Sequence, residues 1–485
     1  MRRHPPRDRG PMPRPGATRP TSPTRRPGTP APRSALRARR HLIGLYLLLG
    51  MTVSSWLSRL PSVRSALDLS ESGLGLVLLL GALGSLATVL VAGGVVTRFG
   101  SRRTLTAAAV MFSAATFLMG LGPTVGSVPL LVVGVFVMSA SFALGNVPMN
   151  VETVVIERAM GRTVVPQFHA AFSVGALAGS LLGAAAAWAE LPLLVQFGGM
   201  ALLALGWRLA SIPGAVLTAP AGPDDAPAPR RAMRSALGAW RERRTLLVGV
   251  IVMTAALSEG SANNWLAIAV VDGFRQTEAM AAVVFGVFTG SMAVARFGGT
   301  WAISRFGRVA VLAASGAVAF AGLLLFGLAP SLPLAVLGVV GWGLGAGLVV
   351  PIGMAAVSHE PLRAAGRVAV VSAFASVSSV VAPPLLGAVA EAVGARRALL
   401  LVAVGLALSI VLASTVRTPD VRAAGDVPDE ASARPGAGAA RPVPVVVPTA
   451  AAAVTASAVA ATATATMGPD VPLPTTTALE PEPCR

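Results

Sequence analysis

The sequence predicts an all-α integral membrane protein in which twelve transmembrane helices form two six-helix bundles. Two features of the composition support this fold class: the mean hydropathy is +0.71, and only 12% of the residues are charged. A soluble chain of 485 residues would need many more polar side chains to cover its surface. The third feature is a series of continuous apolar runs, each close to the length of about 20 residues that crosses a bilayer as a helix. The apolar residues must therefore face lipid.

Twelve such runs follow one another along the chain, and none alternates between apolar and polar residues. Membrane-spanning β-strands would be only about 10 residues long and would alternate, so we predict helices throughout. The first six predicted helices cover residues 41–59, 73–97, 104–121, 127–150, 166–188 and 193–217. The second six cover residues 245–270, 279–304, 309–329, 333–357, 366–393 and 396–416.

Polar and Pro-rich segments divide the chain into domains. We predict an N-terminal six-helix bundle at 41–217 and a C-terminal six-helix bundle at 245–417, joined by a cytoplasmic linker at 218–244. Residues 1–40 are rich in Arg and Pro, and residues 418–485 are rich in Ala, Pro and Thr. Such low-complexity segments are typical of disordered tails, and we expect both to be cytoplasmic. A start codon assigned too early is an alternative explanation of residues 1–40.

The formal net charge of +18 is concentrated in the N-terminal tail. All 39 basic residues of the chain are arginines, and twelve of them lie in residues 1–40 beside the single acid Asp8. This arm has no aromatic residue that could stack on bases, so we expect it to be attracted to anionic lipid headgroups and not to bind nucleic acid. The complete absence of lysine, together with abundant Ala, Gly, Val and Arg, favours a GC-rich bacterial genome.

The sequence offers few groups for metal binding or catalysis. Its only cysteine is Cys484, and its four histidines are scattered at positions 4, 41, 169 and 359. Membrane proteases and transferases need clustered catalytic groups. We therefore expect no metal, no cofactor and no enzymatic activity. The short external loops also leave no room for a receptor's sensor domain.

The distribution of arginine predicts the orientation in the membrane, because basic residues accumulate in cytoplasmic loops. Fifteen arginines follow the even-numbered predicted helices, whereas four follow the odd-numbered ones. Both termini and the linker are therefore expected in the cytoplasm. The four exceptions are Arg64, Arg275, Arg396 and Arg397, and the sequence gives no reason for the last two.

The two halves of the chain repeat one another at a spacing of 204 to 209 residues. With six helices in each half the orientation is preserved, which indicates a parallel repeat about an axis along the membrane normal. The repeated segments are SSWL at 54–57 and NNWL at 263–266, TRFG at 97–100 and SRFG at 304–307, GR at 161–162 and 366–367, and LLGA at 181–184 and 385–388.

From residue 40 to residue 417 the chain resembles the major facilitator superfamily, and especially uncharacterised bacterial inner-membrane permeases near the fucose:proton symporter branch. Four segments carry the resemblance: SRLP at 58–61, the loop at 93–103, the stretch 149–175 and SEGSANNW at 258–265. The resemblance implies a secondary active transporter of a small molecule that works by alternating access. It further implies proton coupling and a monomer within the lipid bilayer.

The family's loop signature G-x-x-x-D-R-x-G-R-R/K matches the segment between predicted helices two and three. The matching residues are Gly93, Arg98, Gly100, Arg102 and Arg103. The acidic position is Thr97 here, so the chain lacks the acid of the family's charge relay. A plain positive-inside anchor would explain the arginines but not the spacing of the glycines.

Predicted helix five carries Gly175, Gly179 and Gly183 on one face. This spacing permits close approach of a neighbouring helix. It also resembles the antiporter motif of drug exporters, G-x-x-x-G-P-x-x-G-G, although Ser180 and Ala184 replace two residues of that motif. The sequence therefore leaves helix packing and export as alternative explanations.

Charged residues inside the predicted helices are the candidates for coupling and substrate binding, because a charge in the bilayer core is costly. Glu259 lies near the midplane, flanked by Asn263 and Asn264. A carboxyl group there can take up a proton from one side and release it to the other. Arg296 has two interpretations: a counter-ion for Glu259, or a side chain that extends towards the membrane interface. His169 suits proton transfer but could equally be a helix cap.

Further candidates have weaker support. Asn150 and Glu152 at the end of predicted helix four, and Arg59 at the outer end of helix one, could line the cavity or its gates. Trp56 and Trp342 offer flat surfaces to a ring-shaped ligand, although tryptophan in a helix more often packs against neighbours.

The function that we predict is proton-coupled secondary active transport of a small molecule. The alternative is a proton-antiport exporter of drugs or metabolites, and a membrane enzyme or receptor is a remote third possibility.

Overall fold

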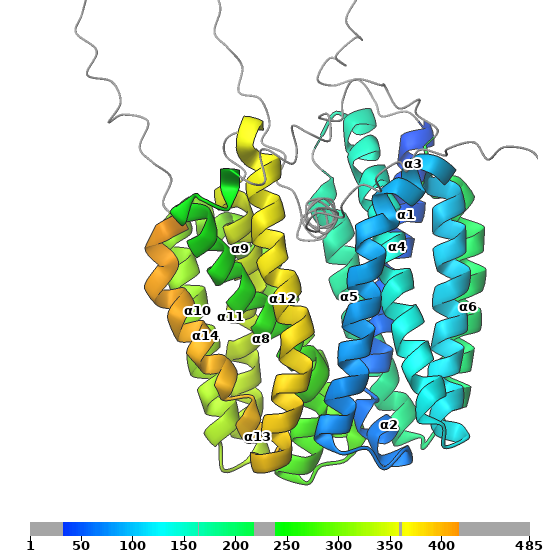
Figure 1. The fold of residues 1–485 in the computed structure, drawn as a ribbon, viewed down its shortest axis with the longest axis vertical. Coiled ribbons are helices and arrows are strands. Elements are labelled where there is room, and N and C mark those ends of the chain that lie inside the picture. Colours follow the sequence, from blue (N-terminus) through cyan, green and yellow to red (C-terminus); the bar gives the residue numbers. More distant parts are fainter. Residues whose placement is uncertain (1–32, 163, 218–237, 358–360, 417–485) are drawn as a thin grey trace, which may run out of the picture.

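The structure is a computed structural model that describes residues 33–162, 164–217, 238–357 and 361–416 (Figure 1). Within these residues all regular structure is helical. The helices of the N-terminal half are α1 (Arg33–Leu57), α2 (Leu60–Ala66), α3 (Glu71–Thr124), α4 (Val128–Met160), α5 (Val165–Trp188) and α6 (Leu193–Ala215). Those of the C-terminal half are α8 (Arg243–Phe274), α9 (Glu278–Phe306), α10 (Arg308–Leu328), α11 (Leu332–Val357), α12 (Pro361–Val393), α13 (Ala395–Ala398), α14 (Leu401–Val411) and the 3-10 helix η1 (Leu412–Val416).

The described residues contain ten helices that are long and apolar enough to cross a membrane, or eleven if the bent pair α1 and α2 is one span. These numbers confirm a multi-pass all-α protein but not the predicted count of twelve. The difference lies in α3, whose 54 residues include two of the predicted helices. Gly100 interrupts α3 with a φ of 79° and a ψ of 160°, so that the helix has two arms. Whether each arm crosses the membrane stays a prediction.

The predicted tails and linker lie mostly outside the described residues. The boundary at residue 40 differs from the structure, because α1 begins at Arg33. Ala35 and Ala38 are almost completely buried against the other helices of the N-terminal half. Because these two alanines are buried, the helix begins earlier than predicted. The arginines around them had led us to assign this segment to the N-terminal tail.

The sequence repeat is also a repeat of backbone geometry. Gly307 has a φ of 78° and a ψ of 160°, within one degree of the values at Gly100. The side chains of Ser70 and Thr277 cap the starts of α3 and α9 by accepting a hydrogen bond from the backbone three residues later. Both pairs are 207 residues apart in the chain. The two halves therefore form the same turns at the same positions.

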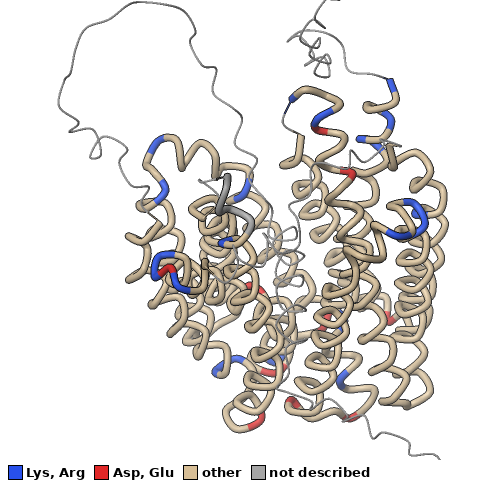
Figure 2. The backbone as a smooth tube through the Cα atoms, turned by 45° about the horizontal axis from the view of Figure 1, so that its top comes forward, with Lys and Arg blue, Asp and Glu red and all other residues tan. Residues whose placement is uncertain are grey.

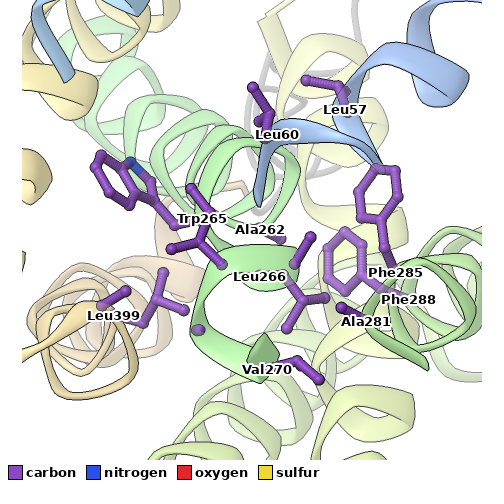
Figure 3. Close-up of a cluster of buried hydrophobic side chains, with 14 of the residues drawn as sticks. Leu57, Leu60, Ala262, Trp265, Leu266, Val270, Ala281, Phe285, Phe288 and Leu399 are labelled. Carbon is purple, nitrogen blue, oxygen red and sulfur yellow. The ribbon is translucent and has the colours of Figure 1, made fainter. Parts of the chain in front are cut away.

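Buried apolar side chains form one cluster across both halves at one end of the molecule, and separate clusters at the other. Near α2, Leu57 and Leu60 of the N-terminal half share a cluster with Leu266, Phe285 and Phe288 of the C-terminal half (Figure 3). At the opposite end one cluster lies within α1 and α3 to α6, and another within the C-terminal half. We call the end at α2 and α13 the closed end and the opposite end the divided end (Figure 1). Because α3 and α9 both begin at the closed end, Gly100 and Gly307, each 29 residues after the first residue of its helix, lie at the divided end.

The glycines of α5 are explained by close packing against α1. A Cβ atom on Gly175 would overlap the carbonyl oxygen of Leu47, and one on Gly179 would overlap that of Met51. Only a residue without a side chain permits this approach of two backbones. The motif therefore provides the interface between α1 and α5.

Replacing Gly175 with valine should destabilise the N-terminal half, because the new side chain must displace the α1 backbone. We expect a loss of about 1–3 kcal/mol, the usual cost of overpacking, measured as a lower Tm of the purified protein in detergent. Gly199 in α6 is the matched control, since nothing lies within 4 Å of the position of its Cβ atom. An equal Tm for Gly175→Val and Gly199→Val would contradict this explanation of the motif.

Candidate functional site

The structure pairs two of the predicted residues, Glu259 of α8 and Arg296 of α9. Arg296 Nη2 lies 3.3 Å from Glu259 Oε2, and Arg296 Nε donates to the carbonyl oxygen of Gly347 at 3.3 Å. The side chains of Glu259 and Arg296 are 27% and 29% exposed. Both charges thus have a partner and also remain accessible, as a binding or proton-transfer site requires.

The ion pair depends on the close packing of α9 against α11. Gly347 lies against the carbonyl oxygen of Met292 and the side chain of Ala295, where an added Cβ atom would be crowded. This approach brings the Gly347 carbonyl within reach of the guanidinium group. Asn263 and Asn264 lie one helical turn after Glu259 and are half-buried. Polar side chains of α8 therefore extend from Glu259 towards the closed end.

The two tryptophans are packing residues. Trp342 is completely buried and its Nε1 donates to Ser258 Oγ at 2.7 Å. Trp56 is 2% exposed and packs edge to face on Phe197. Neither ring surface is open to a ligand, so the interpretation of these rings as binding surfaces is wrong.

A second polar group lies in the N-terminal half around the buried Tyr46. The Tyr46 hydroxyl donates to Asn150 Oδ1 at 3.1 Å, and Asn150 Nδ2 donates to Asn146 Oδ1 at 3.1 Å. The ring of His169 lies beside the Tyr46 ring, with 5.8 Å between the centroids. This links the predicted residues Asn150 and His169 through a tyrosine that sequence reasoning missed, although it is the only tyrosine in the chain.

His169 has an unpaired ring nitrogen inside the protein. Within the described residues His169 Nε2 is buried and has no hydrogen-bond partner. The helix that carries His169, α5, packs against α9, which carries Arg296. The imidazole therefore lies on a helix that neighbours the ion pair of the other half.

Glu152 does not join either group. It is 3% exposed, and its Oε2 accepts a hydrogen bond from the backbone nitrogen of Leu217 at 3.0 Å. This bond joins α4 to the segment that follows α6. Glu152 therefore has a structural role, because it is buried where α4 meets this segment.

The predicted gating loop lies at the divided end. Arg98, Arg102 and Arg103 are exposed, and among the described residues no ion pair joins them to a carboxylate. The Thr97 hydroxyl donates to the carbonyl oxygen of Gly93 within the same helix. With threonine in place of the family's acid, none of these arginines has a carboxylate partner among the described residues, and Arg98 lies over the Phe99 ring.

The closed end is joined by a polar network that includes Arg59, which is 5% exposed. Arg59 Nε lies 3.0 Å from Glu278 Oε2, and Arg59 Nη1 donates to Gln196 Oε1 at 2.6 Å. The backbone nitrogen of Ser62 also donates to Glu278 Oε1 at 2.9 Å. Glu278 belongs to α9, so these contacts tie the N-terminal half to the C-terminal half.

A second ion pair across the halves supports the first. Arg64 Nη1 lies 2.7 Å from Asp272 Oδ2 of α8 and 3.2 Å from Glu71 Oε1 of α3. Sequence reasoning missed Glu278 because an acid in the first turn of a helix is usually explained by the helix dipole. Its repeat position, 207 residues after Glu71, is the signal that could have identified it.

The unexplained Arg396 is a structural residue at the same end. Its guanidinium group lies 4.2 Å from the centre of the Phe274 ring and donates to the carbonyl oxygens of Phe326 and Ala329. Arg396 therefore caps the end of α10. This structural role explains why an arginine occurs in a loop that the positive-inside rule predicts to be external.

No group of three or more His, Cys, Asp or Glu side chains that could hold a metal ion occurs in the part of the chain that the structure describes.

Comparisons of this chain with a family model, with curated proteins and with solved structures all point to the same family. A family model described as the Major Facilitator Superfamily matches residues 42–369 and 249–476. The uncharacterized transporter y4wD of Sinorhizobium fredii is 29% identical over 395 residues, which cover 79% of this chain and 100% of the relative. Membrane protein MosC of Rhizobium meliloti is 25% identical over 367 residues, which cover 74% of this chain and 85% of the relative.

Two solved structures show the same fold. The fucose:proton symporter of E. coli matches with a TM-score of 0.56 and 17% identity, covering 80% of this chain and 100% of that chain. The nucleoside transporter NupG matches with a TM-score of 0.64 and 14% identity, covering 79% of this chain and 100% of that chain. At these identities the likeness concerns the fold alone.

Replacing Glu278 with glutamine should open the closed end, because Arg59 loses its charged partner in the other half. A loss of about 1.4 kcal/mol would raise the open population about tenfold. The reporter is Asn263→Cys in a Cys484→Ser background, labelled by a membrane-impermeant maleimide added on the closed-end side. We expect labelling to be about tenfold faster with Glu278→Gln.

The exposed Glu190 also lies at the closed end and provides the control, since Glu190→Gln should leave the labelling rate unchanged. Equal rates for Glu278→Gln and the parent protein would show that the ion pair does not hold this end shut.

Proposed function

The chain belongs to the major facilitator superfamily, and from this premise we propose that it couples the transport of its substrate to protons by alternating access. Membrane transport of a small molecule, and not enzymatic catalysis, is the activity of the family and of the relatives. The finer proposal places the protein as a monomer in the bacterial inner membrane, with both termini in the cytoplasm. The single observation that carries it is the accessible ion pair between Glu259 and Arg296.

The two ends of the molecule support alternating access. At the closed end one apolar cluster and two ion pairs join the halves, whereas at the divided end the apolar clusters are separate. A family fold of two repeated bundles moves by rocking one bundle against the other. The conformation therefore corresponds to a transporter whose central site is reached from the divided end.

The charge distribution supports an inward-facing assignment. Figure 2 shows that charged residues gather mainly at the ends of the helices and leave most of the tube uncharged. The predicted loop arginines 98, 102, 103, 305 and 308 lie at the divided end. Because basic residues mark the cytoplasmic side, we propose that the divided end faces the cytoplasm.

Glu259 is the group that we propose as the proton site. While ionised it neutralises Arg296 at 3.3 Å. Protonation would remove that negative charge and leave Arg296 in the low-dielectric site without a counter-ion, a costly state that favours rearrangement or a new anionic partner. Proton binding would thereby change the relative stability of the two conformations.

The alternative of a drug or metabolite exporter rested on the glycines of α5. These glycines lie in contact with α1, so packing explains their spacing. No contact in the described residues then favours an exporter over a symporter.

Glu259→Gln should abolish gradient-driven accumulation, because the amide keeps the shape of the side chain but cannot ionise. Compounds that stabilise the purified protein thermally, chosen from a panel of metabolites and antibiotics, serve as substrates in proteoliposomes with an imposed pH gradient. We expect Glu259→Gln to lose concentrative uptake by at least about tenfold, which corresponds to about 1.4 kcal/mol, while exchange at equal substrate concentrations partly survives. His169→Gln should have a smaller effect.

Glu190→Gln, which alters an exposed acid at the closed end, should transport like the parent protein. Full concentrative uptake by Glu259→Gln would remove Glu259 from the coupling step, and His169 would then become the next candidate.

A further inference from the structure

A buried arginine inside the N-terminal bundle has no counter-ion. Arg208 of α6 is 6% exposed, and its Nη2 atom is fully buried without a hydrogen-bond partner in the described part of the chain. No ion pair to Arg208 occurs there either. Arginine stays protonated in proteins, so this is a permanent positive charge within a membrane-spanning helix. Its neighbours Trp207 and Leu209 are exposed on the opposite face, so Arg208 points into the bundle.

The guanidinium group lines a cavity enclosed by α1, α3, α4 and α6. The walls are mainly apolar and include Leu49, Phe112 and Met149. The only polar side chains among the lining residues besides Arg208 are Ser141 and Asn146. The cavity volume is about 30 Å³, which is room for one or two waters or a small anion.

One existing contact partly compensates the charge. The centre of the Arg208 guanidinium lies 4.2 Å from the centre of the Phe112 ring, a cation–π contact. A ring covers only one face of the planar group, and its donors at the edge still need acceptors. The lining contains no carboxylate that could supply them.

We propose that Arg208, together with Asn146, binds a small monovalent anion: either free chloride or the carboxylate group of an organic molecule. Both carry one negative charge and accept the hydrogen bonds that the guanidinium edge donates. Asn146 Oδ1 accepts a hydrogen bond from Asn150, which leaves the amide hydrogens of Asn146 for the anion. The Ser141 hydroxyl donates to the carbonyl oxygen of Val137, so Ser141 lines the cavity without donating to the anion.

This proposal does not depend on proton coupling, because it concerns binding inside one half of the molecule. Its test is the Tm of the purified protein at constant ionic strength, with sodium gluconate replaced stepwise by chloride or by formate. Gluconate is too large for the cavity. We expect a saturable rise in Tm with chloride, formate or both, because an anion that binds the folded state stabilises it by mass action.

Arg208→Gln should abolish this rise and should itself have a Tm in gluconate no lower than that of the parent protein. Arg397 is exposed and is the matched control, since Arg397→Gln removes one positive charge elsewhere and should keep the full rise. Stabilisation by chloride alone would identify a free halide site, and stabilisation by formate alone a carboxylate site. Equal Tm values in gluconate, chloride and formate would overturn the proposal, as would a rise that persists in Arg208→Gln.

If Arg208→Gln fails to fold, the unmodified protein still provides a test. Crystals grown with bromide should show an anomalous scatterer in contact with the Arg208 guanidinium, and formate should displace it. A cavity that holds neither bromide nor formate at Arg208 would overturn the proposal.

Discussion

The joining of the two halves at one end is the constraint on which the rest of the structure depends. Arg59 and Glu278 form an ion pair at 3.0 Å beside a continuous cluster of apolar side chains from both halves. At the divided end, the apolar clusters formed by the described residues are separate, one in each half. The shared apolar cluster thus lies at one end, and the side chains of Glu259 and Arg296 remain partly exposed.

The internal repeat explains how one chain can form two halves that are joined at one end. Gly100 and Gly307 share a backbone conformation, and Ser70 and Thr277 cap equivalent helices. Equivalent halves can close at either end with similar geometry, as transport by rocking bundles requires. The functional charges break the repeat, because Glu259 and Arg296 belong to one half and the group around Tyr46 belongs to the other.

The helices, the repeat and the candidate Glu259 could be predicted from the sequence because hydropathy, glycine spacing and an isolated charge are local properties. The pairing of Arg59 with Glu278, the burial of Trp342 and the isolation of Arg208 could not, since each depends on which helices lie side by side. The start of α1 at Arg33 could not be predicted either. The segment is rich in arginine, and its sequence does not show that its alanines are buried. Sequence patterns thus identified the membrane helices but not the partners within the bundle.

The most direct test of alternating closure is a pair of distance distributions between spin labels in a cysteine-free background. One pair, at Phe99 and Phe306, reports on the divided end, and the other, at Ser65 and Leu328, on the closed end; all four positions are exposed. On acidification or addition of a stabilising ligand, we expect the first distance to shorten while the second lengthens. Two distances that stay fixed, or that change in the same direction, would contradict it.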